Sequence, residues 1–166
     1  GDNPPSYEEV LGLHKMKVQL EEKLEDYNME PGFIPMDLVL FKDAIGYVCR
    51  IGRVLRQIRG NLTLVGIGGS GRQSLSRLAS YTCEHKLFTI EITKQYRSVE
   101  FHEDLKSLFM LAGGEGKQTT FLFSDTQLKE ESFLEDINNI LSSGEVPNLF
   151  TKEEKLAAFD AVRGEA

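Results

Sequence analysis

The sequence predicts an α/β domain in which helices cover both faces of a parallel sheet. Three short apolar runs, at residues 62–65, 87–92 and 119–124, have the β-branched and aromatic content of buried strands. Segments with apolar residues at helical spacing alternate with these runs, at 14–30, 40–57, 73–81, 99–112 and 133–141. Thr151 is a suitable N-cap for a last helix. The alternation predicts three layers, αβα, around one sheet.

The composition predicts one folded domain that binds neither nucleic acid nor membrane. The chain has 166 residues, of which 40% are hydrophobic and 27% charged, which suits a single core. Its 19 basic and 26 acidic residues give a net charge of -7, which is unfavourable for a surface that binds phosphate backbones. No apolar run reaches the length of a membrane span. Cys49 and Cys83 are predicted to be buried, and the three histidines lack partners at metal-ligand spacing.

A glycine-rich loop, GIGGSGRQS, joins the first predicted strand to its helix at positions 66–74. Its outer glycines have the spacing of the phosphate-binding pattern G-x-x-x-x-G-K-[ST]. Backbone N–H groups and the positive end of the next helix can hold phosphates without side chains. The predicted nucleotide ligands in this loop are Gly66, Gly68, Gly69, Ser70, Gly71, Arg72, Gln73 and Ser74.

Two side chains of that pattern are replaced. Arg72 takes the lysine position and keeps the positive charge in a larger, planar group. Gln73 takes the position of the hydroxyl that contacts Mg²⁺, and its amide oxygen is a weaker ligand. Ser74 lies one residue too late to replace that hydroxyl. Considered alone, the loop also fits a structural turn between a strand and a helix.

The third predicted strand supplies a second half of the site. The apolar residues 121–124 end on Asp125, an acid that can hold the water shell of Mg²⁺. Thr126 follows Asp125, at a position where many ATPases with such a strand and acid carry a glutamate. Neither Thr126 nor Gln127 is a general base near neutral pH. Loss of a positioned base typically costs about 10²–10⁴ in rate. We therefore predict nucleotide binding with little or no hydrolysis, no catalytic residue, and Gln73 and Asp125 as weak Mg²⁺ ligands.

Three stretches are long enough to be specific: the loop GIGGSGRQSL at 66–75, FLFSDTQ at 121–127 and FLEDINNILSSGEVPNLF at 133–150. Together they resemble the fourth AAA+ module of axonemal dynein heavy chains. The resemblance implies a P-loop NTPase (AAA+) fold that binds ATP or ADP, with or without Mg²⁺, as one of six modules in a ring. It implies as partners the neighbouring AAA+ modules, dynein intermediate and light chains, and microtubules through the stalk of the parent protein. It implies a location in the cytoplasm and cytoskeleton, in the axoneme of cilia or flagella.

The resemblance also implies a domain organisation. Residues 1–30 would form a linker and an N-terminal helix, and residues 31–166 part of the large, nucleotide-binding subdomain. Such subdomains have five parallel strands, of which this chain supplies three. The last two strands and the helical lid are expected to follow Ala166. Because the fourth strand lies between the first and the third, we expect this piece alone to be marginally stable or rearranged.

Several alternatives stay open. Val39 and Leu40 precede the helix that leads to the loop, and in AAA+ modules such a segment lines the adenine pocket; ordinary core packing is the alternative. Glu91 either faces the site or caps its strand. The acids at 130–136 either form a solvated helix face or contact the next module. Two other functions compete: a structural ring segment with an empty site, and a stand-alone P-loop kinase or NTPase, which the missing lysine, base and last strands disfavour.

Overall fold

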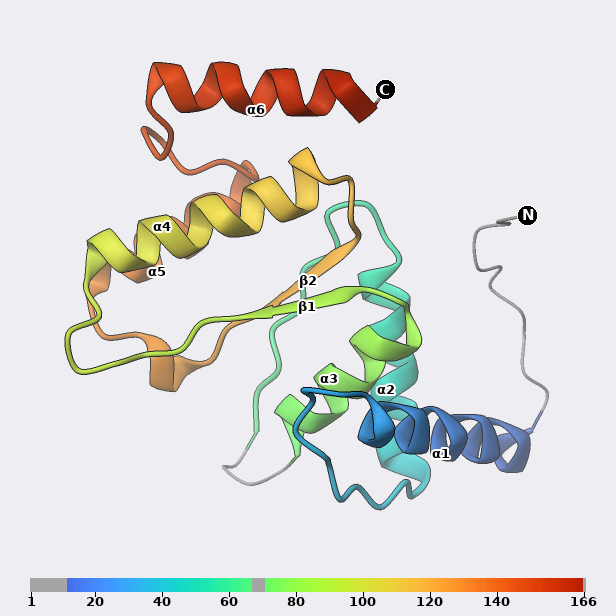
Figure 1. The fold of residues 1–166 in the computed structure, drawn as a ribbon. Coiled ribbons are helices and arrows are strands. Elements are labelled where there is room, and N and C mark those ends of the chain that lie inside the picture. The colour runs from blue at the N-terminus through green and yellow to red at the C-terminus, as the bar shows by residue number, and fades with distance from the viewer. Residues whose placement is uncertain (1–11, 67–70, 166) are drawn as a thin grey trace. The chain divides into compact units, whose positions relative to one another are not determined.

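The computed structural model describes residues 12–66 and 71–165, which divide into two compact units. The first unit comprises Gly1–Val54 and Leu62–Cys83, and the second comprises Leu55–Asn61 and Glu84–Ala166. Each unit has its own helices (Figure 1).

The first unit is built from three helices, α1 (Leu13–Met29), α2 (Lys42–Leu55) and α3 (Arg72–Thr82). All three agree with the segments predicted from helical spacing. Each turns apolar side chains three or four residues apart toward the interior of the unit. The buried residues are Leu20, Leu24 and Tyr27 on α1, Ala44, Ile45, Val48 and Ile51 on α2, and Leu75, Leu78 and Ala79 on α3.

Aromatic and amide contacts fix the end of α1. The rings of Tyr27 and Tyr81, the latter on α3, meet edge to face with centroids 5.5 Å apart. The Asn28 side chain donates to the carbonyl of Met36 at 3.0 Å and accepts from the Met36 N–H at 2.8 Å. These two bonds hold the chain as it returns after Pro31 and Gly32, where the helix was predicted to end.

The predicted strand at 62–65 is wrong, because this segment is irregular. Leu62 is 43% exposed and Val65 is 90% exposed, so the segment is not buried either. A strand needs a neighbouring strand for its N–H and C=O groups. Within the part of the chain that the structure describes, the only sheet is the pair β1 and β2, both in the second unit.

The second unit contains a parallel pair of strands, β1 (Lys86–Thr89) and β2 (Thr119–Leu122). Lys86 lies opposite Thr119 and Thr89 opposite Leu122. The predicted α/β class with a parallel sheet is therefore confirmed. The strand predicted at 87–92 corresponds to β1 and ends earlier than predicted, because residues 90–92 are not paired. The carbonyl of Ile90 accepts instead from the side chain of Gln127, at 2.6 Å.

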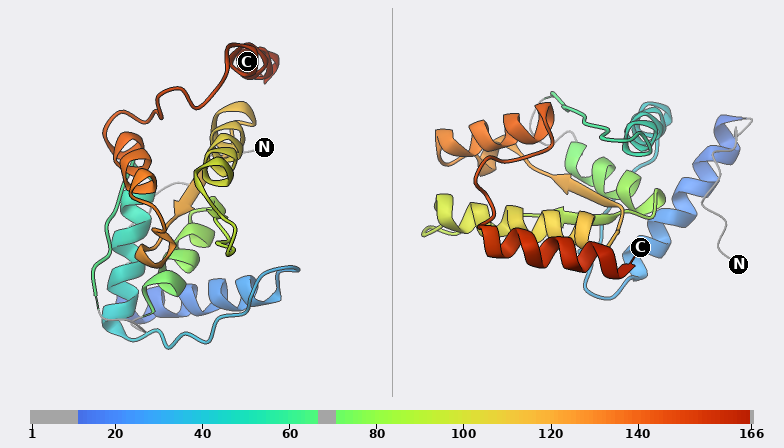
Figure 2. Two further views of the ribbon diagram at one scale, coloured as in Figure 1. Left: turned by 90° about the vertical axis from the view of Figure 1, so that its left-hand side faces the viewer. Right: turned by 90° about the horizontal axis from the view of Figure 1, so that it is seen from above.

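Helices account for the rest of the second unit. The connection between the strands is α4 (Ser98–Phe109), which continues into a π-helical turn, η1 (Met110–Gly114). A 3₁₀ turn, Asp125–Gln127, follows β2 and leads to α5 (Glu131–Ser142) and α6 (Lys152–Glu165). The helices α4 and α5 lie side by side (Figures 1 and 2). His102 on α4 and Asp136 on α5 join them at 2.8 Å.

The core of this unit is aromatic. Phe101 on α4 stacks on Phe133 on α5 with ring centroids 4.3 Å apart, and neither ring is exposed. Tyr96 meets Phe133 edge to face and donates its hydroxyl to the carboxylate of Asp104. Burial, followed by the Asp104 carboxylate, holds the pKa of the Tyr96 phenol well above its ordinary range. Tyr96 therefore stays a neutral donor within the core.

The last helix begins as predicted. Thr151 Oγ1 accepts from the Glu154 N–H at 3.2 Å, and the Glu154 carboxylate accepts from the Thr151 N–H at 2.7 Å. This reciprocal pair is a capping box. Lys106 on α4 bonds the same Glu154 carboxylate at 2.9 Å and so holds α6 to α4. Of the helices in residues 12–66 and 71–165, none is both long and apolar enough to cross a bilayer.

Candidate functional site

The two predicted halves of the site lie in different units: residues 66–74 in the first and Asp125 in the second. Gly68, Gly69 and Ser70 are outside the described residues. Gly66 is exposed and ends the irregular segment that enters the loop.

Gly71 closes the loop and is the N-cap of α3. Its φ of 71° is left-handed, a conformation that glycine adopts without the strain that a side chain would cause. The Leu75 N–H already reaches the Gly71 carbonyl, at 2.8 Å. The N–H groups of residues 72–74 have no acceptor within the helix, and Gly71 has no side chain to cap them. The start of α3 therefore has the geometry and the dipole that suit a phosphate.

Arg72 contacts the other end of its own loop. Its Nη1 donates to the carbonyl of Leu64 at 3.2 Å, and the residue is half-buried. The Ser76 hydroxyl donates to the Arg72 carbonyl at 2.8 Å, within the helix. Gln73 is exposed and Ser74 half-buried. An exposed amide at the Gln73 position offers Mg²⁺ a neutral oxygen, where a hydroxyl is usual.

Residues 38–40 pass beside the start of α3. A side chain on Gly71 would meet the Leu38 methyl Cδ2 at 3.9 Å, so Leu38 is next to the loop. Val39 is 76% exposed, and Leu40 is 3% exposed in the core of the first unit. Leu40 therefore packs in the core, which was the alternative to an adenine pocket for this segment. Of residues 38–40, Leu38 is the one that lies beside Gly71.

In the second unit, Asp125 follows β2 at the carboxyl end of the strand and is exposed. Its carboxylate accepts from the Thr126 N–H at 3.0 Å. The exposed position leaves it accessible to a hydrated cation. Among the residues that the structure describes, no group of three His, Cys, Asp or Glu side chains could hold a metal ion.

Gln127 has a role that the sequence reasoning missed. Its Oε1 accepts from the Ser124 N–H at 2.8 Å, and its Nε2 donates to the carbonyl of Ile90 at 2.6 Å. One amide thus connects the carboxyl ends of β1 and β2 and fixes the turn that carries Asp125. The spacing from Ser124 to Gln127 is that of a capping box, and this signal was available in the sequence.

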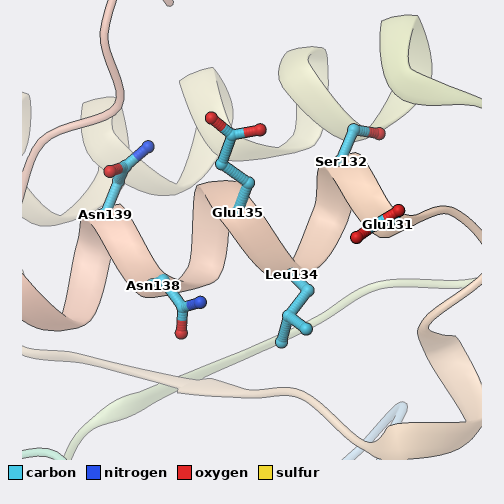
Figure 3. A pocket seen from close by; sticks show the side chains of 6 residues that line it. All are labelled: Glu131, Ser132, Leu134, Glu135, Asn138 and Asn139. Atoms are coloured by element: carbon cyan, nitrogen blue, oxygen red, sulfur yellow. The ribbon is translucent and has the colours of Figure 1, made fainter.

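The acids at 130–136 divide into two groups. Glu130 accepts from the Ser98 hydroxyl at 2.7 Å, and the half-buried Asp136 pairs with His102, so both hold α4 to α5. Glu131 and Glu135 are exposed and line a shallow depression on α5. In Figure 3, Ser132, Glu135 and Asn139 point to one side of the helix, and Leu134 and Asn138 to the other. These side chains therefore do not converge on one point. Glu91 is exposed.

The family model of the P-loop containing dynein motor region D4 matches residues 36–166, most of the chain. The chain belongs to this family. Among its relatives, the Dynein-1-beta heavy chain of the flagellar inner arm I1 complex of Chlamydomonas reinhardtii is 58% identical over 96% of this chain. Dynein axonemal heavy chain 2 of Mus musculus is 56% identical over 91%, and Dynein axonemal heavy chain 1 of Rattus norvegicus is 50% identical over 93%.

These findings confirm the predicted resemblance to an AAA+ module of axonemal dynein heavy chains. A P-loop region of this kind implies nucleotide binding in general. This D4 region spans only 4%, 3% and 3% of the length of the three relatives. It is thus similar to one small part of each of them.

Proposed function

We propose that this chain is a nucleotide-binding AAA+ module of an axonemal dynein heavy chain that binds ATP or ADP with little or no hydrolysis. The observation that carries the proposal is the start of α3, where left-handed Gly71 leaves the N–H groups of residues 72–74 without a capping side chain. Those groups need no side chain to hold a phosphate. The side chains for turnover are replaced by Arg72, Gln73 and Thr126.

The proposed ligands are the loop residues, with Mg²⁺ held weakly by Gln73 and Asp125 if it is held at all. Adenine would lie near residues 38–40. Gly66, Gly68, Gly69 and Ser70 would complete the phosphate cradle. In this proposal residues 1–30 are a linker and helix, and residues 31–166 part of the nucleotide-binding subdomain.

The wider role follows from the relatives. The proposed partners are neighbouring AAA+ modules of the same heavy chain, dynein intermediate and light chains, and microtubules reached through the stalk. The proposed location is the cytoskeleton of the cytoplasm, in the axoneme of a cilium or flagellum. The competing function is a structural ring segment whose site stays empty. The relatives are far longer than this chain, and this disfavours a stand-alone P-loop NTPase.

A titration separates binding from an empty site. A chain extended through the helical lid would be titrated with fluorescent ADP and ATP, with and without Mg²⁺. We expect saturable binding that depends little on Mg²⁺, because Gln73 is a poor Mg²⁺ ligand. No binding at millimolar nucleotide would favour the structural ring segment.

A further inference from the structure

A depression of the first unit lies where the end of α1 meets α3, and its lining combines acidic and aromatic side chains. Asp26, Met29 and Glu30 line this α1–α3 depression from the end of α1, and Tyr81 lines it from α3. The Tyr81 ring meets the buried Tyr27 ring edge to face, with centroids 5.5 Å apart. Because Tyr81 is only half-buried, its ring is held in place and can still be reached from solvent.

The two carboxylates of the depression occupy unfavourable positions on α1. Asp26 lies in the last turn and Glu30 is the C-cap, where the negative end of the helix dipole disfavours acids. They are four residues apart, a spacing at which like charges repel on a helix. Lys23 pairs with Asp26 at 3.9 Å, but both side chains are exposed, and such pairs contribute little. Local rules are typically broken in this way at functional positions.

The Tyr81 hydroxyl indicates that both carboxylates face the same space. It donates to Glu30 Oε1 at 3.4 Å. Burial, followed by the negative charges of Glu30 and Asp26, raises the pKa of the Tyr81 phenol. The depression therefore places a negative potential beside an aromatic ring, a combination that favours a cation.

We propose that the α1–α3 depression binds an arginine side chain of a partner polypeptide. A guanidinium matches the lining, because its planar fork bonds carboxylates and its face stacks on aromatic rings. Its charge also relieves the repulsion between Asp26 and Glu30 and offsets the helix dipole. Phe33, whose ring contacts that of Tyr81, is 46% exposed and Met29 is 73% exposed, so both can pack against the methylene stem of the arginine. The proposal concerns other residues than the nucleotide site and does not depend on it.

Photo-cross-linking from position 29 of the full-length protein tests the proposal. Met29→p-benzoylphenylalanine couples, on irradiation, to whatever lies against the depression. We expect the captured peptide to lie outside residues 1–166 and to contain an arginine beside the point of attachment. Glu30→Gln keeps an acceptor for the Tyr81 hydroxyl and removes the charge. It should reduce the cross-link yield about tenfold, the size expected of one charge-assisted hydrogen bond.

Two controls separate binding from folding. Glu21→Gln removes the same charge from an exposed residue of α1 that pairs with Lys17, and it should leave the yield unchanged. Replacing the captured arginine by glutamine should lower the yield as much as Glu30→Gln does. The two changes together should then add little further loss, because they remove the same contact.

Other outcomes would overturn the proposal. They are the capture of no peptide, the capture of a peptide without arginine, and attachment only within residues 1–166. Equal yields from Glu30→Gln and Glu21→Gln would show that the Glu30 charge does not hold the partner. Losses that simply add when Glu30→Gln is combined with the arginine change would show that the two residues do not contact each other.

Discussion

At the scale of single residues, Gly71 is the position where the backbone conformation limits the sequence most directly. Its φ of 71° costs an L-residue roughly 1–2 kcal/mol. We expect Gly71→Ala to lower the free energy of unfolding by about 1 kcal/mol and to weaken binding of fluorescent ADP. Denaturant unfolding and titration of the chain extended through the lid would measure both effects.

Gly46 provides the matched control. It lies within α2, and a side chain there meets no atom within 4 Å. Alanine is a better helix former than glycine, so Gly46→Ala should stabilise the chain by roughly 0.5–1 kcal/mol and leave ADP binding unchanged. Equal effects of the two substitutions on ADP binding would contradict a specific role for Gly71.

A second prediction at this scale concerns Gln127, whose amide joins the Ser124 N–H to the Ile90 carbonyl. Gln127→Ala removes both bonds and should cost about 1–3 kcal/mol of unfolding free energy. Gln95→Ala, at an exposed residue of the same unit, should change it by less than about 0.5 kcal/mol. The denaturant midpoints of the two variants measure these changes in unfolding free energy. If Gln127→Ala were as mild as Gln95→Ala, the amide would not hold the strand ends.

At the scale of elements, the Glu154 carboxylate both caps the start of α6 and bonds to Lys106 on α4. The bond from Lys106, and then the Thr151 N–H, hold the pKa of Glu154 below its ordinary value of 4.5. A carboxyl with a lowered pKa in the folded state stabilises that state at higher pH, and this contribution is lost as the pH falls below about 4.5. We therefore expect the free energy of unfolding to decrease with falling pH in this window.

Substitutions assign that decrease to Glu154. Glu154→Gln should flatten the pH dependence below pH 4.5, whereas Glu153→Gln, at the exposed neighbour, should leave it as in the wild type. Denaturant unfolding at a series of pH values measures the slope. A wild-type slope in Glu154→Gln would mean that other carboxylates dominate acid unfolding.

The elements also show how far the sequence alone can be used. Helices follow from local apolar spacing, so α1, α3 and the Thr151 cap of α6 were predicted closely. Strands depend on partners that are distant in sequence. Residues 62–65 have strand composition but no partner strand within the described residues, and the strand after residue 86 ends early because Gln127 takes the Ile90 carbonyl.

For the candidate site, the sequence predicted the helix that follows the loop and the strand that precedes Asp125, but not what the side chains contact. The left-handed Gly71 follows from the glycine pattern. The bond from Arg72 to Leu64 could not be predicted, because it depends on the course of the chain on both sides of the loop. The place of Leu38 beside Gly71 likewise requires the packing of the first unit.

At the scale of the whole molecule, the irregular segment 62–65 predicts limited stability for these 166 residues alone. Val65 is 90% exposed, and burying such a side chain against a neighbouring strand would contribute roughly 1.5–3 kcal/mol. We expect a broad thermal transition for this chain, and a sharper one at higher temperature when the chain continues through the next strands and the lid. Calorimetry compares the two, and a cooperative transition of high stability for the short chain would oppose this expectation.

The central claim is that the loop binds nucleotide that it does not turn over. In the most direct measurement, γ-labelled ATP is bound to the chain extended through the lid and unbound nucleotide is removed. The release of labelled phosphate is then followed over time. We predict that the label stays on recovered ATP, with release at least about 100-fold slower than the 1 s⁻¹ at the low end of typical enzymes. Rapid release of phosphate from bound ATP, or no retained nucleotide at all, would contradict the claim.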